Sequence, residues 1–141
     1  MDNRQSWNEY FMEVAEKLAT RSTCDRASVG AVIINADNRT VSTGYNGSLS
    51  GNPHCDEIDH KLRDGHCIAT VHAEINAISY CAKEGIALKG TTLYVTHFPC
   101  INCTKSIISS GIKRIYYRES YRIDEYALEL FKLNSVELHK I

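Results

Sequence analysis

The sequence predicts an α/β sandwich, in which a mixed sheet is covered by helices. Segments with helical and with strand periodicity alternate along the chain, and a pair of short strands near the amino end suits a hairpin. The 141 residues, 43% of them hydrophobic, are enough for one core and leave little room for a second. We therefore expect a single domain over residues 1–141.

The amino-terminal part begins with a predicted amphipathic helix and a hairpin. Residues from about Ser6 to Thr20 place apolar side chains at helical spacing, with Ser6 as N-cap and Glu9 completing a capping box. The segments Val29 to Asn35 and Val41 to Tyr45 are short and β-branched, and the residues between them suit a turn. This pattern indicates two antiparallel strands.

The carboxyl-terminal half alternates helices and strands. In chain order we expect a helix from Val71 to Lys83, a strand from Thr91 to Thr96, a helix from Cys100 to Ser110, a strand from Lys113 to Tyr117, a helix from Asp124 to Leu133 and an edge strand from Ser135 to Leu138. Gly85 and Gly111 follow the first two of these helices and mark their ends. Together with the hairpin, these elements predict a mixed sheet.

Charge and composition restrict the possible partners. The formal net charge is −1, which provides no basic field for a nucleic acid and favours a small substrate. The chain has no apolar run long enough for a bilayer, and its first seven residues lack the pattern of a secretory signal. We therefore expect no membrane span and a cytoplasmic location, in which the six cysteines are metal ligands or free thiols.

Two short motifs carry the chemistry: His72-Ala73-Glu74 and Pro99-Cys100-Ile101-Asn102-Cys103. They match the signature of zinc-dependent deaminases. Each lies at the start of a predicted helix, where the positive end of the helix dipole favours thiolates at Cys100 and Cys103. Two thiolates and the neutral His72 imidazole leave a fourth tetrahedral position open for water, as in a catalytic zinc site.

Glu74 is the predicted proton shuttle of this site. Its carboxylate would take a proton from the attacking water, protonate ring N3 of cytosine and later deliver a proton to the departing ammonia. A structural zinc knuckle is the alternative, but such a site would have four nearby ligands and no use for Glu74. A redox CxxC pair is disfavoured because the motif already has a partner histidine.

Further motifs extend over nearly the whole chain: Ser22-Thr23-Cys24, Val29-Gly30-Ala31, Gly44-Tyr45-Asn46-Gly47, Val71-His72-Ala73-Glu74-Ile75-Asn76-Ala77, Thr96-His97-Phe98-Pro99-Cys100 and Ser110-Gly111-Ile112. With them the chain resembles the deoxycytidylate deaminases of the cytidine deaminase superfamily. The resemblance implies a three-layer α/β/α fold with a five-stranded mixed sheet and hydrolysis of dCMP to dUMP and ammonia, which supplies thymidylate synthesis. It also implies activation by dCTP with Mg²⁺, inhibition by dTTP, and a homo-oligomer, commonly a hexamer.

The resemblance also implies substrate-binding residues. Asn46 would hold the sugar and the ring of the nucleotide, Tyr121 would stack on the base, and Ala73 would line the site. Arg26 is a candidate for the 5′-phosphate because a guanidinium fork pairs with phosphate oxygens, although a solvated surface arginine is the alternative. Arg122 is a weaker candidate for the same phosphate.

For the effector site, the resemblance points to Tyr45, Gly47 and Lys83. A tight turn is the simpler explanation for Gly47, since Asn-Gly is a strong turn signal. An exposed helix lysine is the simpler explanation for Lys83.

The polar stretch from Asn46 to about Thr70 is longer than an ordinary structureless loop, so we expect something to hold it together. Cys24, Cys55 and Cys67, with His66 or alternatively His54, would close a tetrahedron around a second, structural zinc. Phage members of the resembled family carry such a site. Unmetallated thiols and surface histidines are the alternative, and His60, His97 and His139 are given no metal role.

Three classes of function remain. The chain could be a mononucleotide deaminase, a deaminase acting on a base within tRNA or single-stranded DNA, or a noncatalytic zinc module. Net charge disfavours the second class and Glu74 disfavours the third. Within the first class, a bifunctional dCMP/dCTP deaminase is the alternative, because the zinc chemistry determines what happens to the amine and not what carries it.

Overall fold

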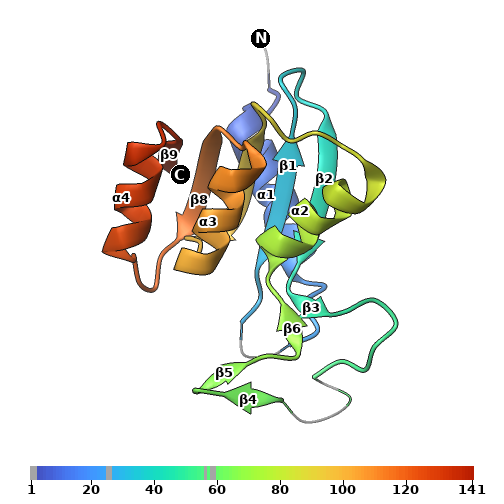
Figure 1. The fold of residues 1–141 in the computed structure, drawn as a ribbon. Coiled ribbons are helices and arrows are strands. Elements are labelled where there is room, and N and C mark those ends of the chain that lie inside the picture. Colours follow the sequence, from blue (N-terminus) through green and yellow to red (C-terminus); the bar gives the residue numbers. More distant parts are fainter. Residues whose placement is uncertain (1–2, 25–26, 56, 58–59) are drawn as a thin grey trace.

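The computed structural model describes residues 3–24, 27–55, 57 and 60–141 (Figure 1). Its elements are α1 (Trp7–Ala19), β1 (Gly30–Ile34), β2 (Thr40–Tyr45), β3 (Gly47–Ser48), β4 (Leu62–Arg63), β5 (His66–Cys67), β6 (Thr70–Val71), α2 (Ala73–Glu84), β7 (Thr92–His97), α3 (Ile101–Ser110), β8 (Arg114–Glu119), α4 (Glu125–Leu133) and β9 (Glu137–Lys140). The central sheet has the order β2-β1-β7-β8-β9. Strand β1 pairs antiparallel with β2 and β7, whereas β7, β8 and β9 run parallel.

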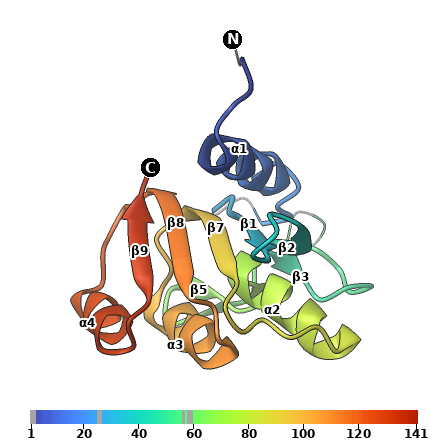
Figure 2. The same cartoon turned by 90° about the horizontal axis from the view of Figure 1, so that it is seen from above.

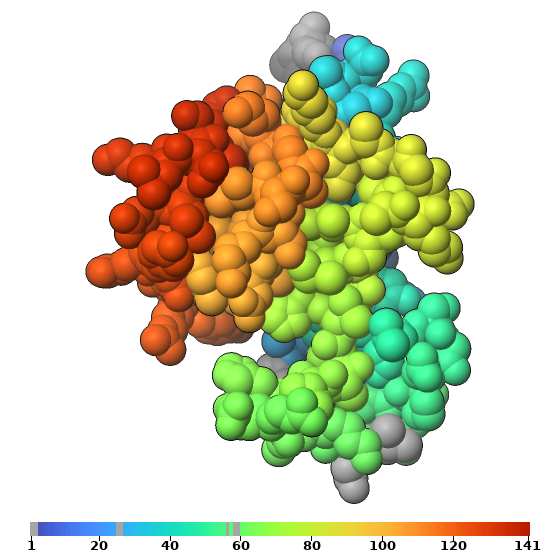
Figure 3. Space-filling view, viewed as in Figure 1, coloured from blue at the N-terminus to red at the C-terminus, as the bar shows by residue number. Residues whose placement is uncertain are grey.

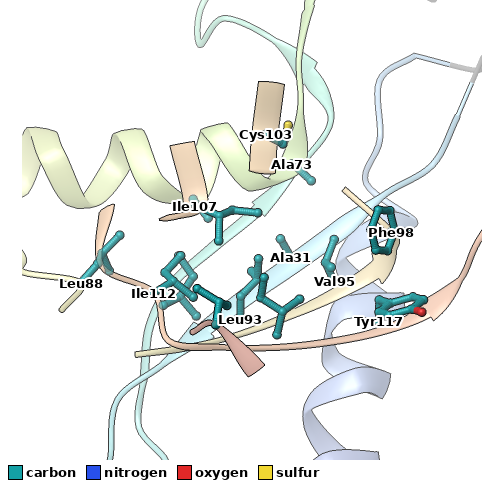
Figure 4. Packing of buried hydrophobic residues seen from close by; sticks show 14 of the residues in the cluster. Ala31, Ala73, Leu88, Leu93, Val95, Phe98, Cys103, Ile107, Ile112 and Tyr117 are labelled. Atoms are coloured by element: carbon teal, nitrogen blue, oxygen red, sulfur yellow. The ribbon is translucent and has the colours of Figure 1, made fainter. Parts of the chain in front are cut away.

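The sheet separates two helical layers. Helix α1 covers one face, and α2, α3 and α4 cover the other (Figure 2). The larger apolar cluster fills the space between the sheet and the three-helix layer (Figure 4). A smaller one packs α1 against β1 and β7. The predicted three-layer α/β/α fold with a five-stranded mixed sheet is confirmed, and no described helix combines the length and apolar character needed to cross a bilayer.

The helix ends follow from the residues that flank them. The Ser6 hydroxyl accepts from the Glu9 backbone N–H at 3.2 Å, which caps α1 as predicted. The capping box is not completed, because the Glu9 carboxylate binds Arg118 of β8 at 3.0 Å instead. Helices α2 and α3 end at Gly85 and Gly111, whose φ values of 73° and 94° suit glycine.

Residues 46–70, expected to be a long polar loop, contain two small ladders. Strand β3 pairs with β6, and β4 pairs with β5. Asp64 and Gly65 connect β4 to β5 with φ values of 52° and 78°, as a type I′ hairpin turn requires. This segment forms the lower end of the molecule in the space-filling view (Figure 3).

Two glycines allow the helices on opposite faces to approach the hairpin closely. A Cβ on Gly30 would lie 1.9 Å from the Ala15 carbonyl oxygen of α1. A Cβ on Gly44 would lie 2.2 Å from the Ala73 carbonyl oxygen of α2. The backbone of α2 cannot move aside as a flexible side chain could, so a side chain at position 44 would push the helix away. Gly44 therefore lets the first turn of α2 lie directly on β2. This contact fixes the start of the helix that carries the HxE motif.

Candidate active site

Three ligand-type side chains converge beside the carboxyl end of β7, at the beginnings of α2 and α3. His72 is the N-cap residue of α2, and Cys100 is the N-cap residue of α3. His72 Nδ1 lies 3.2 Å from Cys103 Sγ and 3.6 Å from Cys100 Sγ, and the three ligand atoms lie within 4.8 Å of one another. Figure 4 shows Cys103 of α3 close to Ala73 of α2. The two motifs therefore meet at one point, as their chemistry requires.

The protonation of these three groups is linked. The pKa of Cys100 is lowered to about 4. A hydrogen bond from the Cys103 thiol is the largest cause, burial opposes it, and a hydrogen bond from His72 adds to the lowering. The hydrogen bond to Cys100 is the largest cause that raises the pKa of Cys103, and burial is the next. A hydrogen bond with Cys100 also raises the pKa of His72. The two thiols and the imidazole are therefore joined by hydrogen bonds, and a soft cation can take the place of the shared protons. This donor set fits zinc, with one tetrahedral position left over.

Glu74 lies in the first turn of α2 and is only 4% exposed. Burial raises the pKa of its carboxyl group, while a backbone N–H bond and the charge of His72 oppose that rise. A hydrogen bond with Cys103 places the carboxyl group beside the metal-ligand atoms, although it is not one of the three. A buried carboxyl group with a raised pKa can both accept and return a proton.

A cavity of about 310 Å³ opens onto these groups. Its described lining is Cys24, Ala27, Val29, Asn46, His66, Cys67, Thr70, His72, Ala73, Glu74, His97, Phe98 and Cys100. The volume is at the lower end of the range for small-molecule sites. This lining comes from the starts of α2 and α3, from His97 and Phe98 at the end of β7, from residues 24, 27 and 29, and from the segment 46–70.

Asn46 and Ala73 both line the cavity, but the Asn46 amide is already engaged. Its Oδ1 accepts from the Val29 N–H at 2.8 Å, and its Nδ2 donates to the Ala27 carbonyl at 2.7 Å. The side chain is 7% exposed, and one Nδ2 hydrogen and one Oδ1 lone pair remain for a ligand. Asn46 thus orders the cavity wall, and its predicted role in substrate binding stays a prediction.

Arg26 and Tyr121 are the other residues predicted to bind the substrate. Arg26 lies outside the described residues, although Cys24 and Ala27 on either side of it line the cavity. Tyr121 is 90% exposed and does not belong to the lining. Its ring instead stacks on His97, with the ring centroids 5.4 Å apart. Tyr121 therefore reaches the cavity only through His97.

His97, which was expected to have no metal role and either to line the pocket or to lie on the surface, lines the cavity. It is the last residue of β7, three positions before Cys100. The end of the strand that leads into a catalytic motif is a signal that could have identified it, because ligands of α/β sheets bind at strand carboxyl ends.

A second group of ligand-type atoms lies in the segment below the sheet. It consists of Cys24, Cys55, His60 and Cys67, whose ligand atoms lie within 4.8 Å of one another. Cys55 Sγ and Cys67 Sγ are 3.3 Å apart, and Cys24 Sγ lies 3.5 Å from His60 Nδ1. Burial raises the pKa of Cys55 to about 12, whereas hydrogen bonds from His60 and the Ala69 N–H overcome burial and lower that of Cys67 to about 6.

The three predicted cysteines are brought together, but the histidine differs from the prediction. His60 occupies the place expected for His66 or His54. His66 and Cys67 are neighbours on strand β5, and neighbouring strand residues direct their side chains to opposite faces. Cys67 is one of the four clustered residues and His66 is not, although both residues contribute to the lining of the catalytic cavity. The Nδ1 atom of His54 is buried without a hydrogen-bond partner among the described residues.

The predicted effector residues lie apart from the metal-ligand atoms. The Tyr45 carbonyl accepts from Asn76 Nδ2 at 2.8 Å, which ties the end of β2 to α2. Gly47 pairs with Val71 in the small ladder, where a Cβ would lie 2.9 Å from Thr23 Oγ1. Lys83 is exposed in the last turn of α2. None of the three lines the described cavity, so their regulatory role stays a prediction.

Comparison with known proteins agrees with this geometry. Residues 5–119 match the family model of the cytidine and deoxycytidylate deaminase zinc-binding region. The chain is 49% identical to ComE operon protein 2 of Bacillus subtilis over 138 residues, which cover 98% of the chain and 72% of that protein. It is 40% identical to the deoxycytidylate deaminase of Mycobacterium phage D29 over 127 residues, covering 82% of the chain and 96% of the phage protein.

A solved structure extends the match to three dimensions. The dCMP deaminase from the cyanophage S-TIM5, in complex with dCMP and dUMP, superposes with a TM-score of 0.84 at 32% identity. The match covers 99% of this chain and all of the cyanophage chain. From the motif geometry, the family model and these relatives, the chain belongs to the cytidine and deoxycytidylate deaminase family.

Proposed function

We propose that this protein hydrolyses dCMP to dUMP and ammonia. The observation that carries the proposal is the meeting of His72, Cys100 and Cys103 with the buried carboxyl group of Glu74 in one small cavity. The likeness to a dCMP deaminase that binds dCMP and dUMP supports the choice of substrate. A cavity of about 310 Å³ and a net charge of −1 suit a mononucleotide better than a polymer.

The three metal-binding residues and Glu74 have different roles in this reaction. His72, Cys100 and Cys103 would hold the zinc ion, which when bound supplies a Lewis acid that makes water nucleophilic at neutral pH. Glu74 takes the proton of the attacking water and protonates ring N3 as the oxygen adds to C4 of cytosine. It then takes the proton of the new C4 hydroxyl group and passes it to the exocyclic amine, which leaves as ammonia while the C4 carbonyl forms, and the carboxylate is regenerated.

We propose further that Cys24, Cys55, His60 and Cys67 hold a second, structural zinc. Three thiols and one imidazole form a complete tetrahedral set, which leaves no position for a substrate. Cys24 and Cys55 are buried, and the four residues come from three separate parts of the chain with little regular structure. An ion at this point would therefore join segments that few other contacts hold.

Regulation and assembly are proposed on the family resemblance. The protein would be activated by dCTP with Mg²⁺ and inhibited by dTTP, would form a homo-oligomer such as a hexamer, and would supply dUMP for thymidylate synthesis in the cytoplasm. Tyr45, Gly47 and Lys83 are the residues proposed for the effector site.

The test is the formation of uracil products from dCMP, cytidine, CMP and dCTP, separated by chromatography. Each substrate is supplied with and without Mg·dCTP or dTTP, and zinc and molecular mass are measured on the same sample. Turnover of dCMP supports the proposal, and its rise with dCTP and fall with dTTP supports the regulation. Turnover of dCTP would favour a bifunctional enzyme, and silence on all four substrates with zinc bound would contradict the proposal.

A further inference from the structure

We propose that His97 contacts the substrate as an uncharged hydrogen-bond donor and that Thr96 positions it by fixing its tautomer. This inference rests on the proposed function, since it concerns how the same cavity holds its nucleotide. His97 lines the same cavity as His72, Glu74 and Cys100.

The hydrogen bonds of Thr96 determine which nitrogen of His97 carries the proton. Thr96 is 4% exposed, and its Oγ1 accepts from the Gly30 N–H at 3.2 Å. The same oxygen lies 2.8 Å from His97 Nδ1. Within the described part of the chain, Nδ1 is the acceptor within reach of the Thr96 hydroxyl hydrogen, and a buried hydroxyl that donates to nothing is costly. Thr96 therefore donates to Nδ1, and the imidazole proton resides on Nε2.

The His97 ring is held at a second point. The Tyr121 ring stacks on it at 5.4 Å with an interplanar angle of 23°. One edge of the imidazole is thus fixed by Thr96 and one face by Tyr121, while Nε2 has no hydrogen-bond partner among the described residues. The Nε2–H group on the remaining edge is available to the cavity.

The charge of His97 suits this role. Burial lowers the pKa of its ring, although the nearby Glu119 carboxylate opposes the shift. A neutral imidazole offers an N–H donor and carries no positive charge that would attract anions nonspecifically. The ligand chemistry that it would recognise is an oxygen acceptor, which a nucleotide offers on the pyrimidine ring, the sugar and the phosphate.

The experiment uses the full-length zinc-loaded protein with His97→Phe and His97→Gln. His97→Phe keeps an aromatic ring against Tyr121 but has no N–H, whereas His97→Gln restores a neutral N–H. We expect His97→Phe to raise KM for dCMP roughly threefold to tenfold, the effect of one neutral hydrogen bond, with a smaller change in kcat. His97→Gln should recover part of that loss.

Two competitive inhibitors distinguish a contact with the base from a contact with the sugar phosphate. If His97 contacts the sugar or the phosphate, His97→Phe weakens inhibition by both dUMP and deoxyribose 5-phosphate. If it contacts the base, only inhibition by dUMP is weakened. Unchanged KM and unchanged inhibition by both compounds would overturn the contact, whereas a wild-type protein that does not deaminate dCMP would overturn the proposed function itself.

Nitrogen chemical shifts of the imidazole test the positioning role of Thr96 without using activity. We expect a single tautomer protonated at Nε2 in the wild type and in Thr96→Ser, and a mixture of tautomers in Thr96→Val. A wild-type ring protonated at Nδ1, or a Thr96→Val spectrum identical to the wild type, would overturn this role.

Discussion

The two Cys/His groups are similar in composition and differ in what holds them. His72, Cys100 and Cys103 stand at the first turns of two helices that are packed on the central sheet. Cys24, Cys55, His60 and Cys67 come from loop segments and a strand of two residues. The packed helices and sheet therefore position the first group without an ion. In the second group, the bound ion would itself hold the loop segments together.

The largest expected effect concerns Glu74, the buried carboxyl group beside the first group. Glu74→Gln should lower kcat by at least about 10²–10⁴-fold, because the amide cannot transfer a proton, and should leave the zinc content unchanged. Product chromatography and atomic absorption on one sample measure both quantities. Loss of one zinc per chain would instead make Glu74 a ligand.

The stability of the chain should distinguish the two groups next. Cys24→Ser, which removes a ligand of the second group, should lower the free energy of unfolding by about 2–4 kcal/mol, since metal binding there contributes to folding. The matched variant Cys103→Ser should abolish turnover with a smaller loss of stability, because apolar packing holds α3 in place. Thermal unfolding followed by circular dichroism checks this order, and the reverse order would contradict it.

The identity of the fourth ligand of the second group can be tested with three matched histidine variants. His60→Ala should remove about one zinc per chain, while His66→Ala and His54→Ala should leave the zinc content unchanged. Cobalt substitution with visible absorption reports the ligand set directly. Equal metal content in all three variants would exclude His60 as the fourth ligand.

A small effect is expected for Tyr121, the outermost predicted substrate residue. Tyr121→Ala should raise KM for dCMP by roughly two- to fourfold, because an exposed ring that stacks on His97 contributes about 0.5–1 kcal/mol. Steady-state kinetics provide the measurement. A change of a hundredfold or more would mean that Tyr121 contacts the nucleotide directly.

The sequence predicted the fold well because local signals and packing agree. Periodicity identified the strands and helices of the main sheet, and Gly85 and Gly111 marked helix ends that the structure confirms. The sequence predicted the three residues that the structure brings together in the first group, since their spacing on two helix starts leaves few other arrangements.

The second group was harder to predict because its geometry depends on loops. Neither helical nor strand spacing relates His60 to Cys24. The adjacency of His66 to Cys67 suggested that both bind one ion, but neighbouring residues of strand β5 direct their side chains to opposite faces. The Asp64-Gly65 turn was the available signal, because a two-residue hairpin imposes alternation on the residues that follow it. The engagement of the Asn46 amide with backbone also depends on tertiary contacts.

We propose that one Cys/His group holds a catalytic ion and the other a structural ion. Anomalous diffraction at the zinc edge, from crystals of the zinc-loaded protein soaked with dUMP, would locate both ions relative to the nucleotide. We expect two peaks per chain, one within bonding distance of His72, Cys100 and Cys103 and facing the nucleotide. The second should lie among Cys24, Cys55, His60 and Cys67, with no contact to the nucleotide. A nucleotide bound away from the first peak, or the absence of that peak, would contradict these assignments.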